Sequence, residues 1–132
     1  QMVQVDEFDN LEELVMPART FGLMRDVEMM RNHNLALGGS LDNAVVVDDQ
    51  GVVNEGGLRF DDEFVRHKVL DAIGDLALAG APIRGKYTGL RAGHELNNKL
   101  LRKAFATEGA MQLVQYSAPS PNLAQGISAL AM

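Results

Sequence analysis

The pattern of hydrophobic and polar residues predicts its clearest helix from about residue 61 to residue 79. Apolar residues recur there at the 3.6-residue period of an amphipathic helix. They are Val65, Val69, Ala72, Ile73 and Leu76. Gly80 and Pro82 follow, and both residue types are common just after the last turn of a helix. The pattern therefore predicts one apolar stripe and one polar face on this helix.

The remaining segments mix short helices and strands. Further helices are predicted at about 8–15, 24–32 and 95–107. In the last of these the residues expected to be buried are Leu96, Leu100, Leu101 and Phe105. Strands are predicted at about 1–5, 18–23, 44–47, 52–53, 83–92 and 111–116, and the turn signal DDQG at 48–51 joins two of them in a hairpin.

This order of elements lacks a regular alternation of strand and helix, so it predicts an α+β fold in two layers. The length of 132 residues suits one domain, which we place at residues 18–116. Residues 1–17 stay unassigned. Residues 117–132 are rich in Ala, Ser and Pro and are predicted to form a flexible tail.

Composition narrows the possible chemistry. A net charge of −6 and a pI near 4.9 argue against binding to nucleic acid. The sequence has no run of about 18 apolar residues, so no membrane span is expected. The chain has no cysteine, so a tightly bound metal would need imidazole and carboxylate ligands. The three histidines are His33, His67 and His94, and His33 lies among polar neighbours that indicate a surface position.

The polar face of the predicted helix carries His67, Asp71 and Asp75 at intervals of four residues. This spacing places the three side chains on one face. An imidazole and a carboxylate one turn apart can chelate one zinc ion, and Asp75 could orient a second imidazole. The same spacing also occurs on ordinary solvated helix faces. Spacing alone leaves both interpretations open.

Two other segments carry candidate chemistry. Gly93 precedes His94 at the start of the last predicted helix, where a nearby carboxylate would favour the cationic ring that a general acid needs. Thr20 lies at a strand end before Gly22, where a hydroxyl could donate to a developing oxyanion. Each residue could equally have a purely local structural role.

Four motifs in a fixed order resolve these alternatives through a resemblance. They are ARTFG at 18–22, NEGGLRF at 54–60, HKVLDAIGDL at 67–76 and GHELNNKLL at 93–101. Together they resemble the carboxy-terminal domain of the UDP-3-O-acyl-N-acetylglucosamine deacetylase family, which acts in lipid A biosynthesis. The likeness runs from about Ala18 to Phe105.

The resemblance implies a zinc-dependent hydrolysis of the N-acetyl group of an acylated UDP-sugar. It implies that His67 and Asp71 are two of three zinc ligands. His94 would act as the cationic acid, hydrogen bonded to Asp75. Thr20 would help to hold the oxyanion. The resemblance also places Lys68 near the anionic part of the substrate.

The family's inserted β-α-β unit, at about residues 22–53 here, forms a passage for the acyl chain. Flexible apolar walls suit such a chain, because each buried methylene contributes about 0.8 kcal/mol. The matching residues are Phe21, Met24, Val27, Leu41, Ala44 and Val46. Without the resemblance each of them would be assigned to the core.

The resemblance further implies one of two similar domains, with the third zinc ligand and the carboxylate base supplied by the amino-terminal domain that this sequence lacks. The chain alone is then expected to be inactive and to expose the apolar side that meets its partner, and such an exposed side can drive self-association. A cytoplasmic bacterial enzyme without membrane insertion is implied. A non-catalytic acyl-binding module and a purely structural domain are the competing interpretations.

Overall fold

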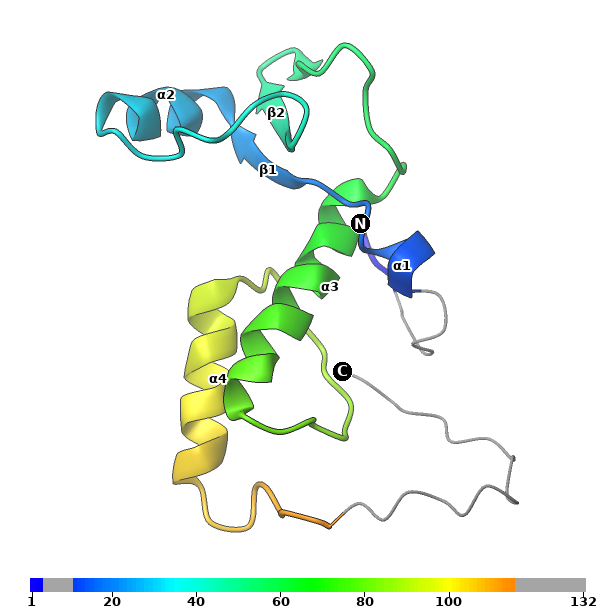
Figure 1. Ribbon diagram of the computed structural model, residues 1–132, viewed down its shortest axis with the longest axis vertical. Helices are drawn as coiled ribbons and strands as arrows, with labels where there is room; N and C mark the ends of the chain where they lie inside the picture. Colours follow the sequence, from blue (N-terminus) through cyan, green and yellow to red (C-terminus); the bar gives the residue numbers. More distant parts are fainter. Residues whose placement is uncertain (4–10, 116–132) are drawn as a thin grey trace. The chain divides into compact units, whose positions relative to one another are not determined.

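The computed structural model describes residues 1–3 and 11–115 and divides the chain into two compact units. Of the described residues, 1–3 and 11–70 belong to the first unit and 71–115 to the second. The predicted α+β class is confirmed by a small mixed sheet and several helices (Figure 1). The elements are α1 (Leu11–Leu14), β1 (Thr20–Leu23), α2 (Met24–Asn32), β2 (Ala44–Asp48), β3 (Gly51–Val52), α3 (Glu63–Leu76), the 3₁₀ helix η2 (Ala77–Ala79) and α4 (His94–Ala106).

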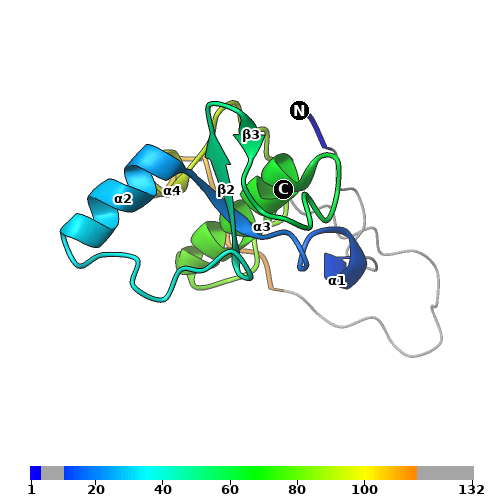
Figure 2. The ribbon, with the colours of Figure 1, turned by 90° about the horizontal axis from the view of Figure 1, so that it is seen from above.

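The first unit contains the predicted β-α-β arrangement. Strand β1 pairs in parallel with β2, with Thr20 opposite Ala44 and Leu23 opposite Val47. Helix α2 is in the connection between them, as a parallel pair requires. Strand β3 then pairs antiparallel with β2 in the predicted hairpin (Figure 2). Val45 is fully buried, so the β-branched run forms the centre of this unit.

Side chains of the loops hold this sheet in register. The carboxylate of Asp48 accepts hydrogen bonds from the backbone N–H groups of Gln50 and Gly51, which closes the hairpin turn. Buried Asn54 accepts from the Val46 N–H at 2.9 Å and donates to the carbonyl of Ala44 at 2.8 Å. Asn54 therefore satisfies backbone groups of β2 that the sheet leaves unpaired.

A buried ion pair anchors the beginning of β1. Glu63, the first residue of α3, has a fully buried side chain that accepts from the backbone N–H and the Nε of Arg19, both at 2.9 Å. The backbone N–H of Arg59 donates to the other carboxylate oxygen at 2.6 Å. Arg19 also donates to the carbonyl of Gly57 at 2.8 Å. The motifs at 18–22 and 54–60 therefore meet at one carboxylate.

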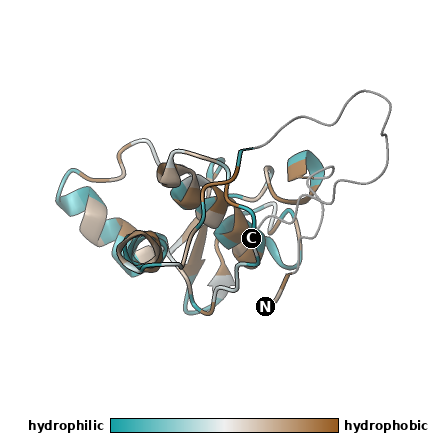
Figure 3. Cartoon of the chain, turned by 90° about the horizontal axis from the view of Figure 1, so that it is seen from below, coloured by the Kyte–Doolittle hydropathy of each residue, from teal (hydrophilic) through white to brown (hydrophobic). Residues whose placement is uncertain are grey.

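The helices predicted at 61–79 and 95–107 are confirmed as α3 with η2 and as α4. Gly80 ends η2 with a positive φ of 79°, a conformation that glycine adopts without strain. Hydrophilic and hydrophobic stretches alternate along the helices in Figure 3, as amphipathic helices require. On α3 the stripe is buried most fully at Ala72 and Leu76.

The expected burial along α4 is wrong for three of its four residues. Leu101 is buried, but Leu96, Leu100 and Phe105 are about half exposed or more. Periodicity shows that a helix has an apolar face but not what covers that face.

Three predicted strands are corrected where they fall on described residues. Residues 83–92 form irregular turns, because Pro82, Gly85 and Gly89 interrupt any extended run. Residues 111–115 are also irregular, and residues 1–3 form no strand. The rest of the strand at 1–5, the first residues of the helix at 8–15, Tyr116 and the tail at 117–132 lie outside the described residues. Within the described part of the chain, no helix is both long and apolar enough to cross a bilayer.

Candidate catalytic and metal-binding site

Helix α3 carries His67, Asp71 and Asp75 at successive turns, as the sequence predicts. The ring of His67 is oriented by the backbone: its Nδ1 lies 3.0 Å from the carbonyl oxygen of Ala18. A carbonyl can only accept, so Nδ1 carries a proton, and in the neutral ring Nε2 then has the lone pair. A histidine that binds a metal through Nε2 needs this tautomer, in which the other nitrogen, Nδ1, donates to a backbone carbonyl.

The second unit brings His94 and Asp75 together. Nδ1 of His94, the first residue of α4, lies 2.9 Å from each carboxylate oxygen of Asp75. Nε2 of the same ring is 3.9 Å from Oδ1 of Asp71. The ring itself is 72% exposed, whereas the two carboxylates are mostly buried. An imidazole held in this way presents Nε2 to a ligand while Nδ1 is committed to Asp75.

Asp75 receives a second hydrogen bond that the sequence analysis did not predict. Nδ2 of Asn97, on the next turn of α4, donates to Oδ2 of Asp75 at 2.8 Å. The hydroxyl of Tyr87 in turn donates to Oδ1 of Asn97 at 2.6 Å. Asn97 is only 2% exposed. A continuous set of hydrogen bonds therefore runs from Tyr87 through Asn97 and Asp75 to His94.

The candidate residues of the first unit gather around β1. Thr20 is exposed at the start of the strand. The ring of Phe21 makes an edge contact with Phe64, with centroids 4.9 Å apart, and its centroid lies 6.4 Å from that of His67. Nζ of Lys68 is 5.1 Å from the Phe21 centroid, within cation–π range. Two predicted site residues, His67 and Lys68, therefore lie near the ring of a third, Phe21.

The residues predicted to line an acyl passage all belong to the β-α-β arrangement or its flanks. Phe21 and Leu41 are partly exposed, at 39% and 47%, while Val46 is buried in the sheet. Met24, Val27 and Ala44 are half-buried. His33, at the end of α2, is exposed, as its polar neighbours indicate.

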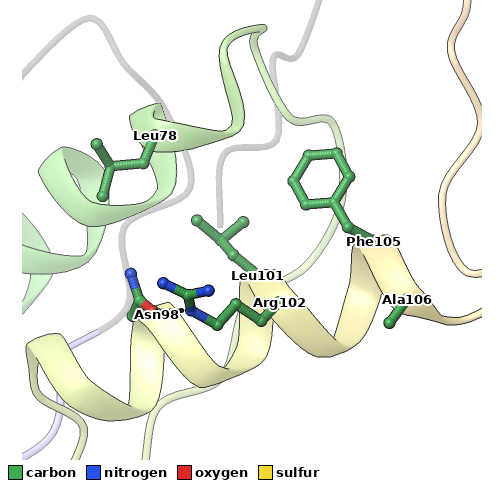
Figure 4. Close-up of a pocket in the computed structure, with 6 residues that line it drawn as sticks. All are labelled: Leu78, Asn98, Leu101, Arg102, Phe105 and Ala106. Carbon is green, nitrogen blue, oxygen red and sulfur yellow. Dashed lines mark hydrogen bonds between the residues drawn. The ribbon is translucent and has the colours of Figure 1, made fainter.

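The second unit has a separate shallow hollow of about 560 Å³ along α4 (Figure 4). Leu78 from η2 faces side chains of α4 across it, and Arg102 donates to Asn98 at its edge. Its lining residues are Leu78, Asn98, Leu101, Arg102, Phe105 and Ala106. None of these is a predicted site residue.

The residues present fit part of a metal site. Among residues 1–3 and 11–115, no three His, Asp or Glu side chains are grouped so that they could hold a metal ion. The donor types and the spacing on α3 nevertheless match two ligands of a three-ligand zinc site. The described residues could therefore offer at most two ligands to a metal ion on this helix, and a third would have to come from elsewhere.

No role was predicted from the sequence for four residues described above, which are Arg19, Glu63, Tyr87 and Asn97. Arg19 and Asn97 stand inside the recognised motifs, so the motifs contain a signal for them. Tyr87 and Glu63 carry no such signal, because their partners are distant in the sequence.

The chain belongs to the family described as UDP-3-O-acyl N-acetylglycosamine deacetylase, whose model matches residues 1–106. Similar curated relatives carry the name UDP-3-O-acyl-N-acetylglucosamine deacetylase. The protein of Marinobacter nauticus is 62% identical over 102 residues, which cover 77% of this chain and 34% of the relative. That of Pseudomonas entomophila is 60% identical over 100 residues, or 76% and 33% of the two chains.

The chain thus spans about a third of the length of the curated relatives it matches. The family model also covers residues 1–17, which the sequence analysis left unassigned, so the likeness extends further toward the amino terminus than the motifs indicate.

Proposed function

We propose that this chain forms the carboxy-terminal part of the active site of an enzyme that hydrolyses the N-acetyl group of UDP-3-O-acyl-N-acetylglucosamine, giving acetate and a free amine. The observation that carries the proposal is the arrangement around His94. Its Nδ1 is bonded to Asp75 at 2.9 Å, and its Nε2 lies 3.9 Å from Asp71. A proton donor thus stands beside a carboxylate suited to bind a metal.

In this proposal His67 and Asp71 bind a zinc ion, and the remainder of the enzyme supplies a third ligand and a carboxylate base. The protonated Nδ1 of His67 supports its part, because the hydrogen bond to Ala18 leaves Nε2 with the lone pair. When bound, zinc polarises the amide carbonyl and activates water.

The chain's own residues orient the substrate and move the proton. His94, held by Asp75, donates a proton to the leaving amine and offsets the charge that develops on the carbonyl oxygen. Thr20 helps to hold that oxyanion. Lys68 contacts the anionic part of the substrate, with its position limited by Phe21.

The β-α-β arrangement accepts the acyl chain in this proposal. The apolar residues involved are Phe21, Met24, Val27, Leu41, Ala44 and Val46. Relatives of this chain are bacterial proteins, and we place the reaction in the bacterial cytoplasm, on a precursor of lipid A.

Substitution of His67 tests the metal site. In the full-length enzyme, His67→Ala should lower the zinc content measured after dialysis and abolish deacetylation. His33→Ala is the matched control: that ring is exposed, and its Nδ1 also contacts a backbone carbonyl, so zinc content and activity should not change. The 132-residue chain with added zinc should show no turnover. Unchanged zinc content in His67→Ala, or robust turnover by the chain alone, would contradict the proposal.

A further inference from the structure

The hydrogen bonds behind the His94–Asp75 pair have no part in the function proposed above. Asn97 is buried and uses both ends of its amide: Nδ2 donates to Asp75 at 2.8 Å and Oδ1 accepts from Tyr87 at 2.6 Å. An amide can rotate by 180° to exchange its donor and acceptor. The flipped amide would place its oxygen against the Asp75 carboxylate, which can only accept, and it would also remove the oxygen to which the Tyr87 hydroxyl donates.

From this geometry we propose that Asn97 is a positioning residue for the catalytic acid, and that Tyr87 fixes the orientation of the Asn97 amide. The inference rests on the proposed role of His94. A fixed Asp75 carboxylate holds the His94 ring more firmly, and Asn97 supplies a hydrogen bond to that carboxylate from the same helix that carries His94. Helix α4 therefore fixes both the ring and the carboxylate that orients the ring.

The surroundings of Tyr87 suit a permanent donor. Burial, and then the negative charge of Asp75, raise the pKa of Tyr87, so its hydroxyl keeps its proton across the working range of an enzyme. The loop also packs tightly on this residue. A Cβ added to Gly89 would lie 2.8 Å from the Tyr87 hydroxyl oxygen and 2.9 Å from Cβ of Ala92. Gly89 thus allows the loop to close on the hydroxyl.

The first test replaces Asn97 in the full-length enzyme. Asn97→Asp keeps the side-chain volume and the acceptor for Tyr87, but it turns the donor facing Asp75 into a repelling oxygen. We expect Asn97→Asp and Asn97→Ala to lower kcat by about 10- to 100-fold, the loss typical of a displaced catalytic group, with KM changed less than about threefold. Thermal unfolding identifies any variant that has lost its fold.

The second test perturbs the far end of the hydrogen-bond set. Tyr87→Phe and Gly89→Ala should each lower kcat by a smaller factor, because the amide of Asn97 is freed but not removed. In the Asn97→Ala background, Tyr87→Phe should have no further effect, since residues acting in series are not additive. Gly85→Ala is the control: it lies in the same loop, and its added Cβ would meet nothing within 4 Å.

The ¹⁵N chemical shifts of the His94 ring separate a positioning role from a general loss of structure. At a pH where the ring is neutral, they should report a proton fixed on Nδ1 in the wild-type enzyme and a mixture of the two tautomers in the Asn97 variants. The inference would be overturned if the Asn97 variants had a kcat within threefold of wild type. It would also be overturned if their kcat fell while the ¹⁵N shifts of His94 stayed unchanged. The ring signal does not depend on turnover, so absence of deacetylase activity in the wild-type enzyme would refute the proposed function and leave this test valid.

Discussion

Replacing His94 by alanine in the full-length enzyme should lower kcat by about 10²- to 10⁴-fold, the usual contribution of a general acid. The ring is 72% exposed and contributes little packing, so the variant should fold normally. The bond of Nδ1 to Asp75 leaves Nε2, which lies 3.9 Å from Asp71, as the nitrogen that would donate the proton. Steady-state kinetics on the acylated UDP-sugar measures the effect.

Zinc content and a matched variant show which role His94 has. His94→Ala should keep its zinc, because we propose that the metal is bound by His67 and Asp71. The exposed His33 again provides the control, with kcat unchanged on replacement by alanine. A His94→Ala enzyme that loses its zinc would make His94 a ligand, and one with kcat within threefold of wild type would contradict its role as the acid.

Replacing Glu63 by alanine should lower the free energy of unfolding by about 3–5 kcal/mol, because the mostly buried guanidinium of Arg19 is then left without its counter-charge. Asp62→Ala is the neighbouring control: the pair of Asp62 with Arg66 is more exposed, so its loss should lower the free energy of unfolding much less. Urea denaturation measures both values. Equal losses in the two variants would contradict the importance assigned to the buried pair.

Acid should weaken the same interaction. Burial raises the pKa of Glu63, but hydrogen bonds from the Arg19 side chain and from the backbone N–H groups of Arg19 and Arg59 outweigh it and lower the pKa from its ordinary 4.5 to about 2. The folded protein thus binds this proton more weakly than the unfolded chain does. The resulting stabilisation is fully present above about pH 4.5 and is lost as the pH falls toward about 2. Glu63→Gln should lack this part of the pH dependence.

Helices and the hairpin were predictable from the sequence because their signals are local. The stripe that ends at Leu76 and the Gly80 stop predict α3 with η2, and the β-branched run before Asp48 predicts β2. The segment at 83–92 misled the prediction because Tyr87 and Leu90 suggest a strand. Its glycines favour a loop, and the bond of Tyr87 to Asn97 then holds that loop.

The candidate site was predictable only in part. Spacing places His67 and Asp71 on one helix face, but their proposed roles come from the resemblance, because the same spacing occurs without a metal. Contacts between distant segments carry no local signal. Glu63 meets Arg19 across 44 residues, and Asn97 meets Asp75 across 22. Burial of Leu96 was predicted wrongly for a related reason, since a helical period does not reveal whether a neighbour covers it.

The most direct measurement is the position of the metal in crystals of the full-length enzyme, located by anomalous scattering at the zinc absorption edge. The account predicts one zinc peak bonded to Nε2 of His67 and to a carboxylate oxygen of Asp71, each at about 2.0–2.2 Å, with His94 nearby but not bonded to it. A zinc ion bound elsewhere, with His67 and Asp71 outside its coordination sphere, would contradict the central claim.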